Sequence, residues 1–509
     1  MNDHPVSRFN LAQSLLDPNL ERHPDKIAYF CQDEEVSYRQ LADAARRVAA
    51  LLQARDIETG DRVLLVLQDS PVFIASLLGV MLVGGVAVIA GTSLTSEDYR
   101  FIQEDSGAQM LFASASLPEA TALAGPSLPC LRCGESLAEW LTRLPGVSVS
   151  SVPRSGDDDV LMLYTSGSTG RPKGVPHSAN DVQASAEAFA GGVLAMTSED
   201  VVFSVSKLFF AYGLGNSFTF PLRFGATAVL HPAKPEPAEI RRLITNHRVS
   251  LFFAVPVVYT MLLKTMPPDW RPETLRLCVS AGEALPAPVA REWHAQTGIE
   301  LLDGIGSTEV THIYIAQRPG ESQPGATGRL IPPYETRIVD EAGAELADGS
   351  PGTMHVRGPS LARRYWKRPE KTAATMLADG WLNTGDIFRR DDGWYYYLGR
   401  HDDMFKVDAQ WVSPLKIEEV LREHPAVLDC GVTWRSLEGL NHPLAFVVPG
   451  EGQNPDPALD RELRQFAAQQ LPSHMVPVQI EFIAELPKTA TGKVQRFRLR
   501  ELFTERSAS

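Results

Sequence analysis

One stretch of the chain, an apolar segment that leads into a glycine-rich basic loop, restricts the possible folds more than any other. Val160–Leu163 is a short apolar run, typical of a buried strand. The following segment, Tyr164–Val175, contains four Ser/Thr hydroxyls, three glycines, one arginine and one lysine. Glycines let backbone N–H groups approach an anion, and hydroxyls and cations add further donors. The segment therefore predicts a strand followed by a loop that wraps a polyphosphate.

This loop differs from the Walker A pattern, in which the second glycine follows the first after four positions and precedes Lys-Ser/Thr. Counting from Gly167, that second glycine would stand at Pro172, and Lys173 is followed by Gly174. A flexible Ser/Gly-rich linker is the alternative interpretation. It is disfavoured because such linkers rarely carry Arg-Pro-Lys between an apolar strand and the start of a helix.

The chain around this loop alternates apolar strands with segments of helical spacing. Strands are expected at 63–67, 86–89, 110–112 and 201–205, with a helix over 41–52 between the earlier ones. This alternation is typical of a doubly wound α/β domain. The segment 209–216 is expected to form an apolar, glycine-rich loop.

The run from Val72 to Ala90 is almost wholly apolar and long enough to span a bilayer. Gly84-Gly85 interrupts it, so a buried helix, a glycine turn and a parallel strand explain it better. We therefore expect no membrane span.

The later part of the chain predicts a second kind of architecture. Residues 324–400 contain short strands separated by Gly and Pro and predict a small β subdomain. The composition changes again near Gly399, where a charged stretch suits a domain boundary. We expect an α/β fold: a large N-terminal domain over 1–400, with doubly wound sheets and a small β subdomain, and a smaller α+β domain over 401–509.

Charge and cysteine content limit the function classes. The formal net charge is 48 − 62 = −14, so a general nucleic-acid-binding role is not expected. Five cysteines are few and odd in number, which favours free thiols in a reducing compartment, here the cytoplasm. Cys130 and Cys133 have metal-site spacing, but no second pair completes a zinc site.

Five motifs in order carry a family resemblance: Tyr164–Val175, Gly304–Glu309, Thr384–Asp386, Gly399–Asp403 and Pro487–Lys493. On these motifs, residues 10 to 503 resemble the adenylate-forming superfamily of acyl-CoA synthetases, adenylation domains and luciferases. The resemblance implies activation of a carboxylic acid by ATP and Mg²⁺. It also implies that the C-terminal domain moves as a lid.

The resemblance also implies roles for individual residues. Thr308 lies near the reacting carboxylate, and Glu309 and Thr165 hold Mg²⁺. Asp386 binds the ribose, Arg400 the ribose or phosphate, and Asp402 is the hinge. Lys493 is the lysine that approaches the carboxylate and α-phosphate. ATP is further held by Thr165, Ser166, Gly167, Ser168, Thr169 and Lys173, and by Gly282, Glu283, Ala284, Asp303, Gly304, Ile305, Gly306 and Ser307.

From the residues alone, an ordinary structural role stays open as the alternative for three of these positions. An acid after Ser307-Thr308 suits a helix start, so Glu309 could serve there without a metal. Asp386 could be a turn aspartate. Lys493 could be an ordinary surface lysine.

Three segments, 207–216, 280–286 and 306–313, resemble the benzoate–CoA ligase branch. An aryl acid needs a short, flat, apolar slot with few polar groups. Benzoate is the first expectation, and anthranilate or a hydroxybenzoate are alternatives. His312 could bind the substrate or be structural. The expected lining residues are Ala211, Tyr212, Gly213, Ala281, Gly282, Ile305, His312, Ile313 and Lys406.

One departure concerns the acyl acceptor. The branch has Ser-Gly where Asp408-Ala409 stand, in the loop that the resemblance assigns to the thioester step. Coenzyme A is the expected acceptor, and the phosphopantetheine of a carrier protein is the alternative. A non-catalytic nucleotide-binding protein is a third hypothesis. The sequence leaves the oligomeric state open, including a homodimer.

Overall fold

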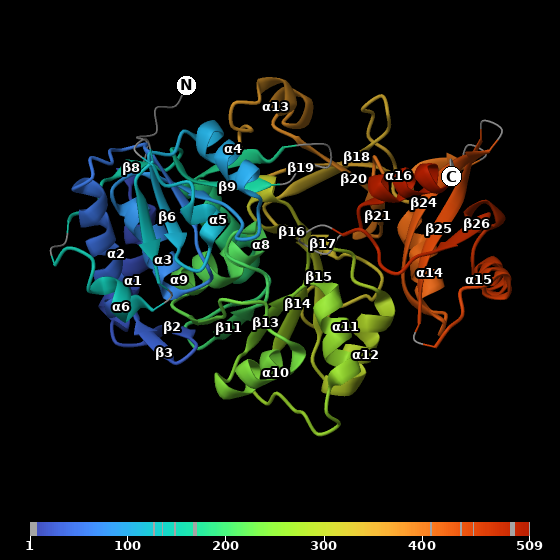
Figure 1. Ribbon diagram of the computed structural model, residues 1–509, viewed down its shortest axis with the longest axis horizontal. Helices are drawn as coiled ribbons and strands as arrows, with labels where there is room; N and C mark the ends of the chain where they lie inside the picture. Colours follow the sequence, from blue (N-terminus) through green and yellow to red (C-terminus); the bar gives the residue numbers. More distant parts are fainter. Residues whose placement is uncertain are drawn as a thin grey trace. The chain divides into compact units, whose positions relative to one another are not determined.

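The computed structural model describes residues 8–125, 128–134, 136–146, 149–165, 171–407, 410–437, 440–450, 452–488 and 494–507 (Figure 1). The chain divides into two compact units. The first comprises Met1–Glu335 and Val356–Leu382, and the second comprises Thr336–His355 and Asn383–Ser509. The expected hinge boundary after residue 400 stays a prediction.

The first unit contains a six-stranded sheet that carries the predicted phosphate loop. Its strands pair in the order β10-β9-β5-β4-β6-β7, and all pairs are parallel except β10 with β9. The non-consecutive order requires helical crossovers, as expected for a doubly wound fold. The strands are β4 (Arg62–Val66), β5 (Val86–Ile89), β6 (Met110–Ser114), β7 (Cys130–Cys133), β9 (Asp159–Thr165) and β10 (Lys173–Ser178).

Helices pack against this sheet and explain the long apolar run. Helix α3 (Pro71–Leu82) is capped by Ser70, and all twelve of its residues are buried. It packs on α2 (Tyr38–Gln53) so closely that a Cβ on Gly79 would stand 2.5 Å from Val48. Gly84, at φ 76°, then turns the chain into β5. No helix in the described ranges is long and apolar enough to span a bilayer.

A nine-stranded sheet forms the other half of the first unit. Its order is β17-β16-β15-β14-β13-β11-β12-β2-β3, parallel from β15 to β2 and antiparallel at both ends. The strands are β2 (Ile27–Cys31), β3 (Glu34–Ser37), β11 (Val201–Ser204), β12 (Thr227–Leu230), β13 (Leu251–Ala254), β14 (Leu277–Ser280), β15 (Leu301–Gly306), β16 (Ile313–Ala316) and β17 (Arg329–Leu330).

Helices α10, α11 and α12 lie side by side along this sheet (Figure 1). Trp293 and Tyr259 of these helices pack edge to face, with ring centroids 5.0 Å apart, in a core shared with Phe252 of β13. The carboxyl ends of β14 and β15 carry the polar and glycine-rich turns predicted to bind the nucleotide. The helices are α10 (Pro237–Asn246), α11 (Pro256–Thr265) and α12 (Ala287–Thr297).

The remaining elements of the first unit are short or peripheral. Strands β1 (Arg8–Phe9) and β8 (Arg154–Ser155) form a small antiparallel pair. The helices are α1 (Leu11–Arg22), α4 (Ser96–Ser106), α5 (Pro118–Thr121), α6 (Leu137–Leu141), α7 (Ala179–Ser185), η1 (Ala186–Gly191), α8 (Ala211–Leu214), η2 (Gly215–Thr219), α9 (Phe220–Phe224), η3 (Thr308–Val310) and α13 (Pro369–Thr375).

One local prediction was wrong. The segment 209–216, expected to be a loop, is largely helical and forms α8 and the start of η2. Its glycines permit close packing rather than irregular backbone. A Cβ on Gly213 would stand 2.1 Å from the Lys207 carbonyl oxygen, and one on Gly215 would stand 2.4 Å from His312.

The second unit contains the predicted small β subdomain and an α+β region. A four-stranded sheet has the order β18-β19-β20-β21, and a three-stranded sheet has the order β24-β25-β26 with helices α14, α15 and α16. The elements are β18 (Glu335–Val339), β19 (Gly352–Arg357), β20 (Leu382–Asp391), β21 (Trp394–Arg400), β22 (Phe405–Val407), β23 (Gln410–Val412), α14 (Pro414–Arg422), β24 (Val427–Leu437), β25 (Leu440–Pro449), α15 (Pro457–Gln470), η4 (Ser473–Met475), β26 (Gln479–Phe482) and α16 (Arg496–Ser507).

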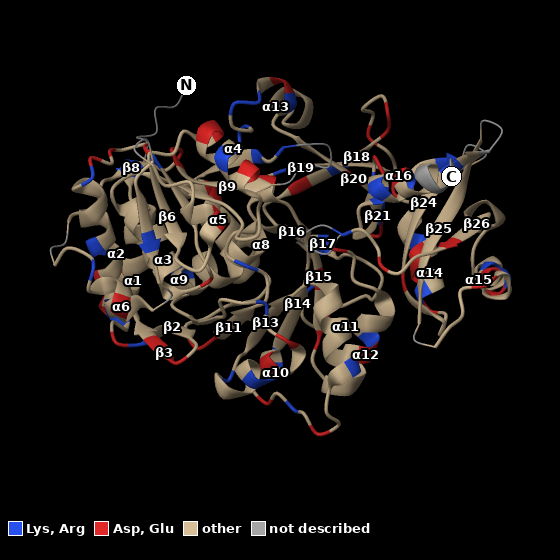
Figure 2. Ribbon diagram, in the orientation of Figure 1, with Lys and Arg blue, Asp and Glu red and all other residues tan. Residues whose placement is uncertain are grey.

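Acidic and basic side chains are interspersed along both units (Figure 2). With an excess of 14 acidic groups, the chain as a whole does not attract an anion. A phosphate ligand therefore has to be bound by cations placed locally. All five cysteines lie in described parts of the chain, and none forms a disulfide.

Candidate active site

The predicted phosphate loop joins two paired strands. In the antiparallel β9–β10 ladder Thr165 stands opposite Lys173, so both ends of the loop are fixed beside each other. Ser166, Gly167, Ser168 and Thr169 lie outside the described residues. Side chains at positions i and i+4 of a strand share a face. Lys173 and His177 therefore both project from one face of β10, and both contact the turn that starts at Thr308.

Lys173, Glu309 and Tyr365 form a compact cluster beside this loop. Lys173 Nζ lies 3.0 Å from Glu309 Oε1, with both side chains largely buried. The Tyr365 hydroxyl donates to the same oxygen at 2.6 Å. Lys173 Nζ also lies 3.9 Å from the centroid of the Tyr365 ring, a cation–π arrangement. Glu309 is thus held from two sides through one oxygen.

The cluster keeps Glu309 ionised. Burial alone would raise the pKa of Glu309, because a charged carboxylate loses its hydration. The Lys173 charge and the hydrogen bond from Tyr365 outweigh burial and hold this pKa below its ordinary value of 4.5. A buried carboxylate that stays charged is a suitable ligand for a hard divalent cation.

The turn that carries Thr308 and Glu309 is held from the other side by His177. His177 is fully buried, and its Nε2 donates to the Thr308 carbonyl oxygen at 2.7 Å. Its Nδ1 lies 3.3 Å from the Thr311 hydroxyl. Thr311 has φ 72°, a conformation that costs a β-branched residue about 1–3 kcal/mol. Its hydroxyl offsets part of this cost by donating to the Ser360 carbonyl oxygen at 3.0 Å.

The aromatic part of the site centres on His312. His312 is buried, and its Nε2 lies 3.2 Å from Asn216 Oδ1 and 3.3 Å from the Tyr212 carbonyl oxygen. Burial lowers the pKa of His312 to about 3, so the ring is neutral and Nε2 carries the proton toward these two acceptors. The other nitrogen, Nδ1, is buried and has no hydrogen-bond partner in the described structure. It is therefore an acceptor available to a ligand.

Aromatic rings surround this histidine. Phe220, Phe189 and Tyr212 have ring centroids 4.6, 5.1 and 5.4 Å from that of His312. The Tyr212 hydroxyl donates to the Val279 carbonyl oxygen at 3.0 Å, so the phenol is satisfied within the protein. The described residues here provide apolar ring faces and an unsatisfied acceptor, as an aryl pocket requires.

A buried ion pair supports the start of the segment 207–216, which we call the aryl segment. Lys207 Nζ lies 3.8 Å from Asp69 Oδ2 and donates to the carbonyl oxygens of His231 (2.5 Å) and Ala233 (2.7 Å). Asp69 Oδ1 accepts from the Leu208 amide at 3.2 Å. Burial raises the pKa of Asp69 to about 6, and the charge of Lys207 and this amide oppose the rise. The pair fixes the backbone immediately before α8.

The predicted adenine region contains several buried oxygens without partners. Ser280 Oγ, Asp303 Oδ1 and Ser307 Oγ are buried and accept or donate no hydrogen bond within the described ranges. Ser280 ends β14, Asp303 stands opposite it on β15, and Ser307 follows the end of β15. Burial raises the pKa of Asp303 well above its ordinary value, opposed by the amides of Gly304 and Leu285. Unsatisfied buried oxygens are uncommon in native proteins and suit a polar ligand at this place.

Gly282, the next predicted nucleotide residue, lies in the turn after β14 with φ 92°, a conformation that favours glycine. Glu283 and Ala284 follow in the same turn. Gly304 and Gly306 are in β15, and a Cβ at Gly306 would stand 2.3 Å from the His312 carbonyl oxygen. Across the β15–β16 hairpin that this close approach permits, Ile305 pairs with Ile315 and Gly306 pairs with Ile313. These residues belong to the first unit together with Lys173, Glu309 and His312.

The other predicted residues lie in the second unit. Asp386 is 7% exposed, and its Oδ1 accepts from Arg400 at 3.0 Å across the β20–β21 ladder. Asp402 is exposed, 3.7 Å from His401. Lys406 pairs with Glu341 at 3.1 Å. The structure thus brings Asp386 and Arg400 together. Lys493, Asp408 and Ala409 lie outside the described residues.

Three contact residues were not predicted from the sequence. Tyr365 contacts Glu309, His177 holds the Thr308 turn, and Asn216 accepts from His312. Asn216 lies in a segment that had been singled out, so its polarity within an apolar run was a usable signal. His177 stands four positions after Lys173, and the strand period was the only signal for it. No sequence signal indicated Tyr365, because it lies within a run of aromatic and basic residues and does not stand out from its neighbours.

Comparison with known proteins identifies the family of this chain. The family model for AMP-binding enzymes matches residues 16–366, and that for the AMP-binding enzyme C-terminal domain matches residues 416–493. A benzoate–CoA ligase of Thauera aromatica is 39% identical over 508 residues, covering 97% of this chain and 96% of that protein.

Solved structures agree as well. A benzoate CoA ligase from Burkholderia xenovorans LB400 is 38% identical, with a TM-score of 0.88, and covers 97% of this chain and 100% of that one. The anthranilate CoA ligase AuaEII, in complex with anthranoyl-AMP, is 33% identical, with a TM-score of 0.91, and covers 100% of this chain and 99% of that one. The chain therefore belongs to the family of AMP-binding, adenylate-forming enzymes. Within that family it falls in the benzoate–CoA ligase branch.

Proposed function

We propose that this enzyme activates an aryl carboxylic acid, benzoate or a close amino- or hydroxybenzoate, with ATP and transfers the acyl group to coenzyme A. The products are aryl-CoA, AMP and pyrophosphate. The observation that carries the proposal is the buried Lys173–Glu309–Tyr365 cluster at the foot of the phosphate loop, in the same unit as the aromatic site around His312. The benzoate and anthranilate specificities of the similar proteins support the aryl acid.

In the first step, two anions have to come together. A carboxylate oxygen of the acid bonds to the α-phosphorus of ATP, and the bond from that phosphorus to the bridging oxygen of pyrophosphate breaks. Lys173 and the loop residues Thr165, Ser166, Gly167, Ser168 and Thr169 are proposed to hold the departing phosphates. Positive groups placed in advance lower the energy of the charge that develops in this step. This is why a chain with net charge −14 carries Arg171 and Lys173 here.

Magnesium is proposed to bind at Glu309, with Thr165 nearby. The residues fit it, because Glu309 is ionised and both of its side-chain contacts use the single oxygen Oε1. The described residues contain no cluster of three or more His, Cys, Asp or Glu side chains that could hold a metal. Mg²⁺ typically binds one or two carboxylates plus substrate phosphates, and it would supply charge neutralisation of those phosphates.

Further residues are proposed to bind the ribose, the α-phosphate and the adenine of ATP. Asp386 is proposed to accept the ribose hydroxyls, with Arg400 beside it, and Thr308 to lie by the reacting carboxylate. Lys493 is proposed to follow the negative charge as it moves between the carboxylate and the α-phosphate, which a flexible ammonium can do. Asp402 is the proposed hinge. The adenine is proposed to lie among Gly282, Glu283, Ala284, Asp303, Gly304, Ile305, Gly306 and Ser307.

The aryl ring is proposed to lie against Tyr212 and the neutral His312. Because His312 Nδ1 is an unsatisfied acceptor, an N–H or O–H substituent on the ring would satisfy it. This one polar contact would separate anthranilate or a hydroxybenzoate from benzoate. The rest of the proposed pocket consists of Ala211, Gly213, Ala281, Gly282, Ile305, Ile313 and Lys406.

In the second step, the coenzyme A thiolate attacks the acyl carbon and AMP leaves. The Asp408-Ala409 departure keeps a carrier-protein phosphopantetheine as the alternative acceptor. A homodimer and a cytoplasmic location are also proposals, the latter because none of the five cysteines, all of them in described parts of the chain, forms a disulfide.

A panel of aryl acids assayed for pyrophosphate release tests this function. Benzoate, 2-aminobenzoate and the 3- and 4-hydroxybenzoates are each supplied with ATP and Mg²⁺, with and without coenzyme A, and hexanoate serves as the non-aryl control. We expect release with at least one aryl acid, little with hexanoate, and aryl-CoA when coenzyme A is present. An aryl-AMP that accumulates without aryl-CoA would reject coenzyme A as acceptor. No release with any acid would reject the function.

A further inference from the structure

The segment Arg363–Arg368 is fastened to the first unit by ion pairs. Arg363 pairs with Asp157 at 2.6 Å, Arg364 with Asp159, and Arg368 with Asp105 at 3.0 Å. The partners lie more than 200 positions away in the sequence, at the start of β9 and on α4. Partly exposed pairs are worth at most about 1 kcal/mol each, but the three together fix the path of the segment.

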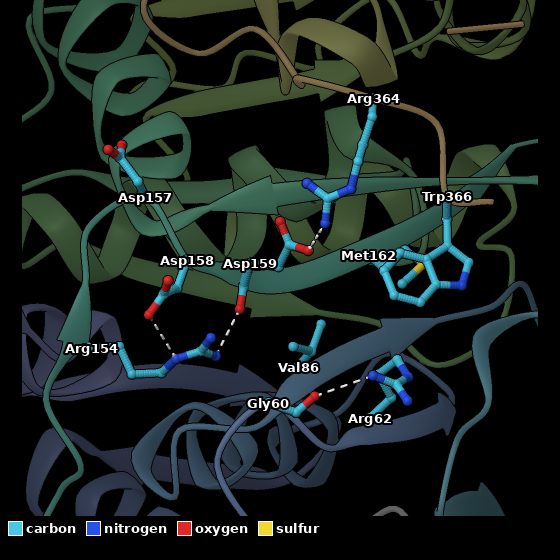
Figure 3. A pocket seen from close by; sticks show the side chains of 10 residues that line it. All are labelled: Gly60, Arg62, Val86, Arg154, Asp157, Asp158, Asp159, Met162, Arg364 and Trp366. Atoms are coloured by element: carbon cyan, nitrogen blue, oxygen red, sulfur yellow. Dashed lines mark hydrogen bonds and ion pairs between the residues drawn. The ribbon is translucent and has the colours of Figure 1, made fainter. Parts of the chain in front are cut away.

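We call the segment Arg363–Arg368 with its three ion pairs the arginine clamp. A cavity of about 280 Å³ lies beside this clamp, and the residues that line the cavity show how the clamp is built (Figure 3). Its lining includes the ion pair between Arg364 and Asp159 and the ion pair between Arg154 and Asp158, the latter at 3.3 Å. Asp157 is engaged by Arg363. The three aspartates of the cavity therefore already have arginine partners, so the cavity is better explained as part of the clamp than as a ligand site.

The clamp holds the segment Arg363–Arg368 against β10, the strand that carries Lys173. The Trp366 amide donates to the Gly174 carbonyl oxygen at 2.9 Å, and its indole Nε1 donates to the Asp105 carbonyl oxygen at 2.8 Å. A Cβ on Gly174 would stand 2.7 Å from Met162 Sδ and 3.1 Å from Trp366 Cβ. The residue next to Lys173 is thus covered by the residue next to Tyr365.

Tyr365 is placed by these contacts rather than by its own helix. Its side chain is buried, its amide donates to the Thr372 hydroxyl at 3.0 Å, and α13 begins only after it. Its hydroxyl reaches Glu309 at 2.6 Å while its ring lies under Lys173 Nζ. The amide of Ala362, three residues earlier, donates to the Glu309 carbonyl oxygen at 2.8 Å. Both the backbone and the carboxylate of Glu309 are therefore held by this segment.

We propose that Tyr365 is a positioning residue that keeps the Glu309 carboxylate in place when Lys173 turns to the phosphates of ATP. This inference rests on the proposed function, which assigns Lys173 to the phosphates and Glu309 to the metal.

The reason lies in the different chemistry of the two partners of Glu309. An ammonium neutralises the carboxylate and competes with a cation for it, whereas a phenol donates a hydrogen bond and leaves the charge intact. When the phosphates attract Lys173, the carboxylate loses its charged partner. The neutral Tyr365 hydroxyl can then hold it oriented toward a divalent cation.

The variant Tyr365→Phe tests the inference because it removes the hydroxyl and keeps the ring. The dissociation constant of ATP is measured by calorimetry without aryl acid, once with excess Mg²⁺ and once with EDTA. We expect the constant to rise about tenfold with Mg²⁺, the effect of one hydrogen bond to a charged group, and to be unchanged with EDTA.

Two controls separate positioning from general damage. Tyr38→Phe removes another buried hydroxyl, which donates to the Ala226 carbonyl oxygen at 2.7 Å, and should change neither constant. In a Glu309→Gln background, Tyr365→Phe should add nothing to the ratio of the two constants, since no carboxylate remains to be positioned. Thermal unfolding of each variant checks that the fold is retained.

Equal weakening with Mg²⁺ and with EDTA, or no change in either, would overturn the positioning role. A wild-type enzyme whose affinity for ATP does not depend on Mg²⁺ would instead overturn the metal assignment of the proposed function. The two failures are therefore distinguishable.

Discussion

Replacing Glu309 by glutamine removes one charge from the centre of the site and leaves its volume almost unchanged. The amide oxygen can still accept from Tyr365, at 2.6 Å in the native protein. Lys173, however, loses its carboxylate partner at 3.0 Å in a place where its side chain is only 20% exposed. The substitution therefore isolates the charge of Glu309 from its packing.

The magnitude follows from that geometry. Removing one partner of a hydrogen bond between charged groups costs about 1.5–3 kcal/mol when the other partner stays largely buried. The free energy of unfolding of Glu309→Gln should fall by about this amount, less whatever hydration Lys173 recovers, and the unfolding midpoint should fall by several degrees. Pyrophosphate release should fall by at least about a hundredfold, as when a group aimed at developing charge is removed.

The effect of Glu309→Gln on stability should change with pH in a defined direction. The pKa of Glu309 is held below 4.5 in the folded protein, so its stabilisation is fully present above about pH 4.5. It is lost as the pH falls through the lower folded value. The stability difference between wild type and Glu309→Gln should be constant near neutral pH and shrink in acid. Chemical denaturation at a series of pH values measures it. A difference that grows in acid, or wild-type activity and Mg²⁺ dependence in the variant, would refute the reasoning.

Further predictions concern the aryl segment, a buried acid and the adenylation lysine. Gly213→Ala places a Cβ 2.1 Å from the Lys207 carbonyl oxygen and should raise KM for the aryl acid at least about tenfold with a small effect on KM for ATP, as steady-state kinetics would show. The pKa of Asp69 is raised to about 6 from 3.8, so the stability difference between wild type and Asp69→Asn should decrease by about 3 kcal/mol as the pH rises across this interval, which denaturation of both proteins would measure. Lys493→Ala should lose adenylate formation yet still use preformed aryl-AMP, and full ATP-dependent turnover would contradict its role.

Much of the fold follows from local patterns. The strand expected over 86–89 is β5, and the apolar run before it is the buried helix α3, because Ser70 and Gly84 supply a cap and a turn. In the segment 209–216 the local prediction was wrong. Its glycines indicated a loop, but they serve the close approach of a helix to Lys207 and His312, which is a tertiary property.

The sequence predicted the candidate site as single residues, whose roles stay predictions, but it did not predict the contacts between them. Lys173 and Glu309 were each expected near phosphate, yet their ion pair spans 136 positions and depends on two sheets meeting. Tyr365 was missed because its role is created by the pairing of Arg364 with Asp159, far away in the sequence. For His312 the substrate-binding and the structural roles both stay open, since Nε2 is satisfied within the protein and Nδ1 has no partner among the described residues.

Exchange of labelled pyrophosphate into ATP tests the central claim most directly. It is measured with an aryl acid and Mg²⁺ in the absence of coenzyme A, and coenzyme A is then added to the same mixture. We predict exchange that requires the aryl acid, followed by formation of aryl-CoA and AMP when coenzyme A is added. Absence of exchange with every aryl acid tested, or release of ADP and phosphate in place of AMP and pyrophosphate, would contradict the account.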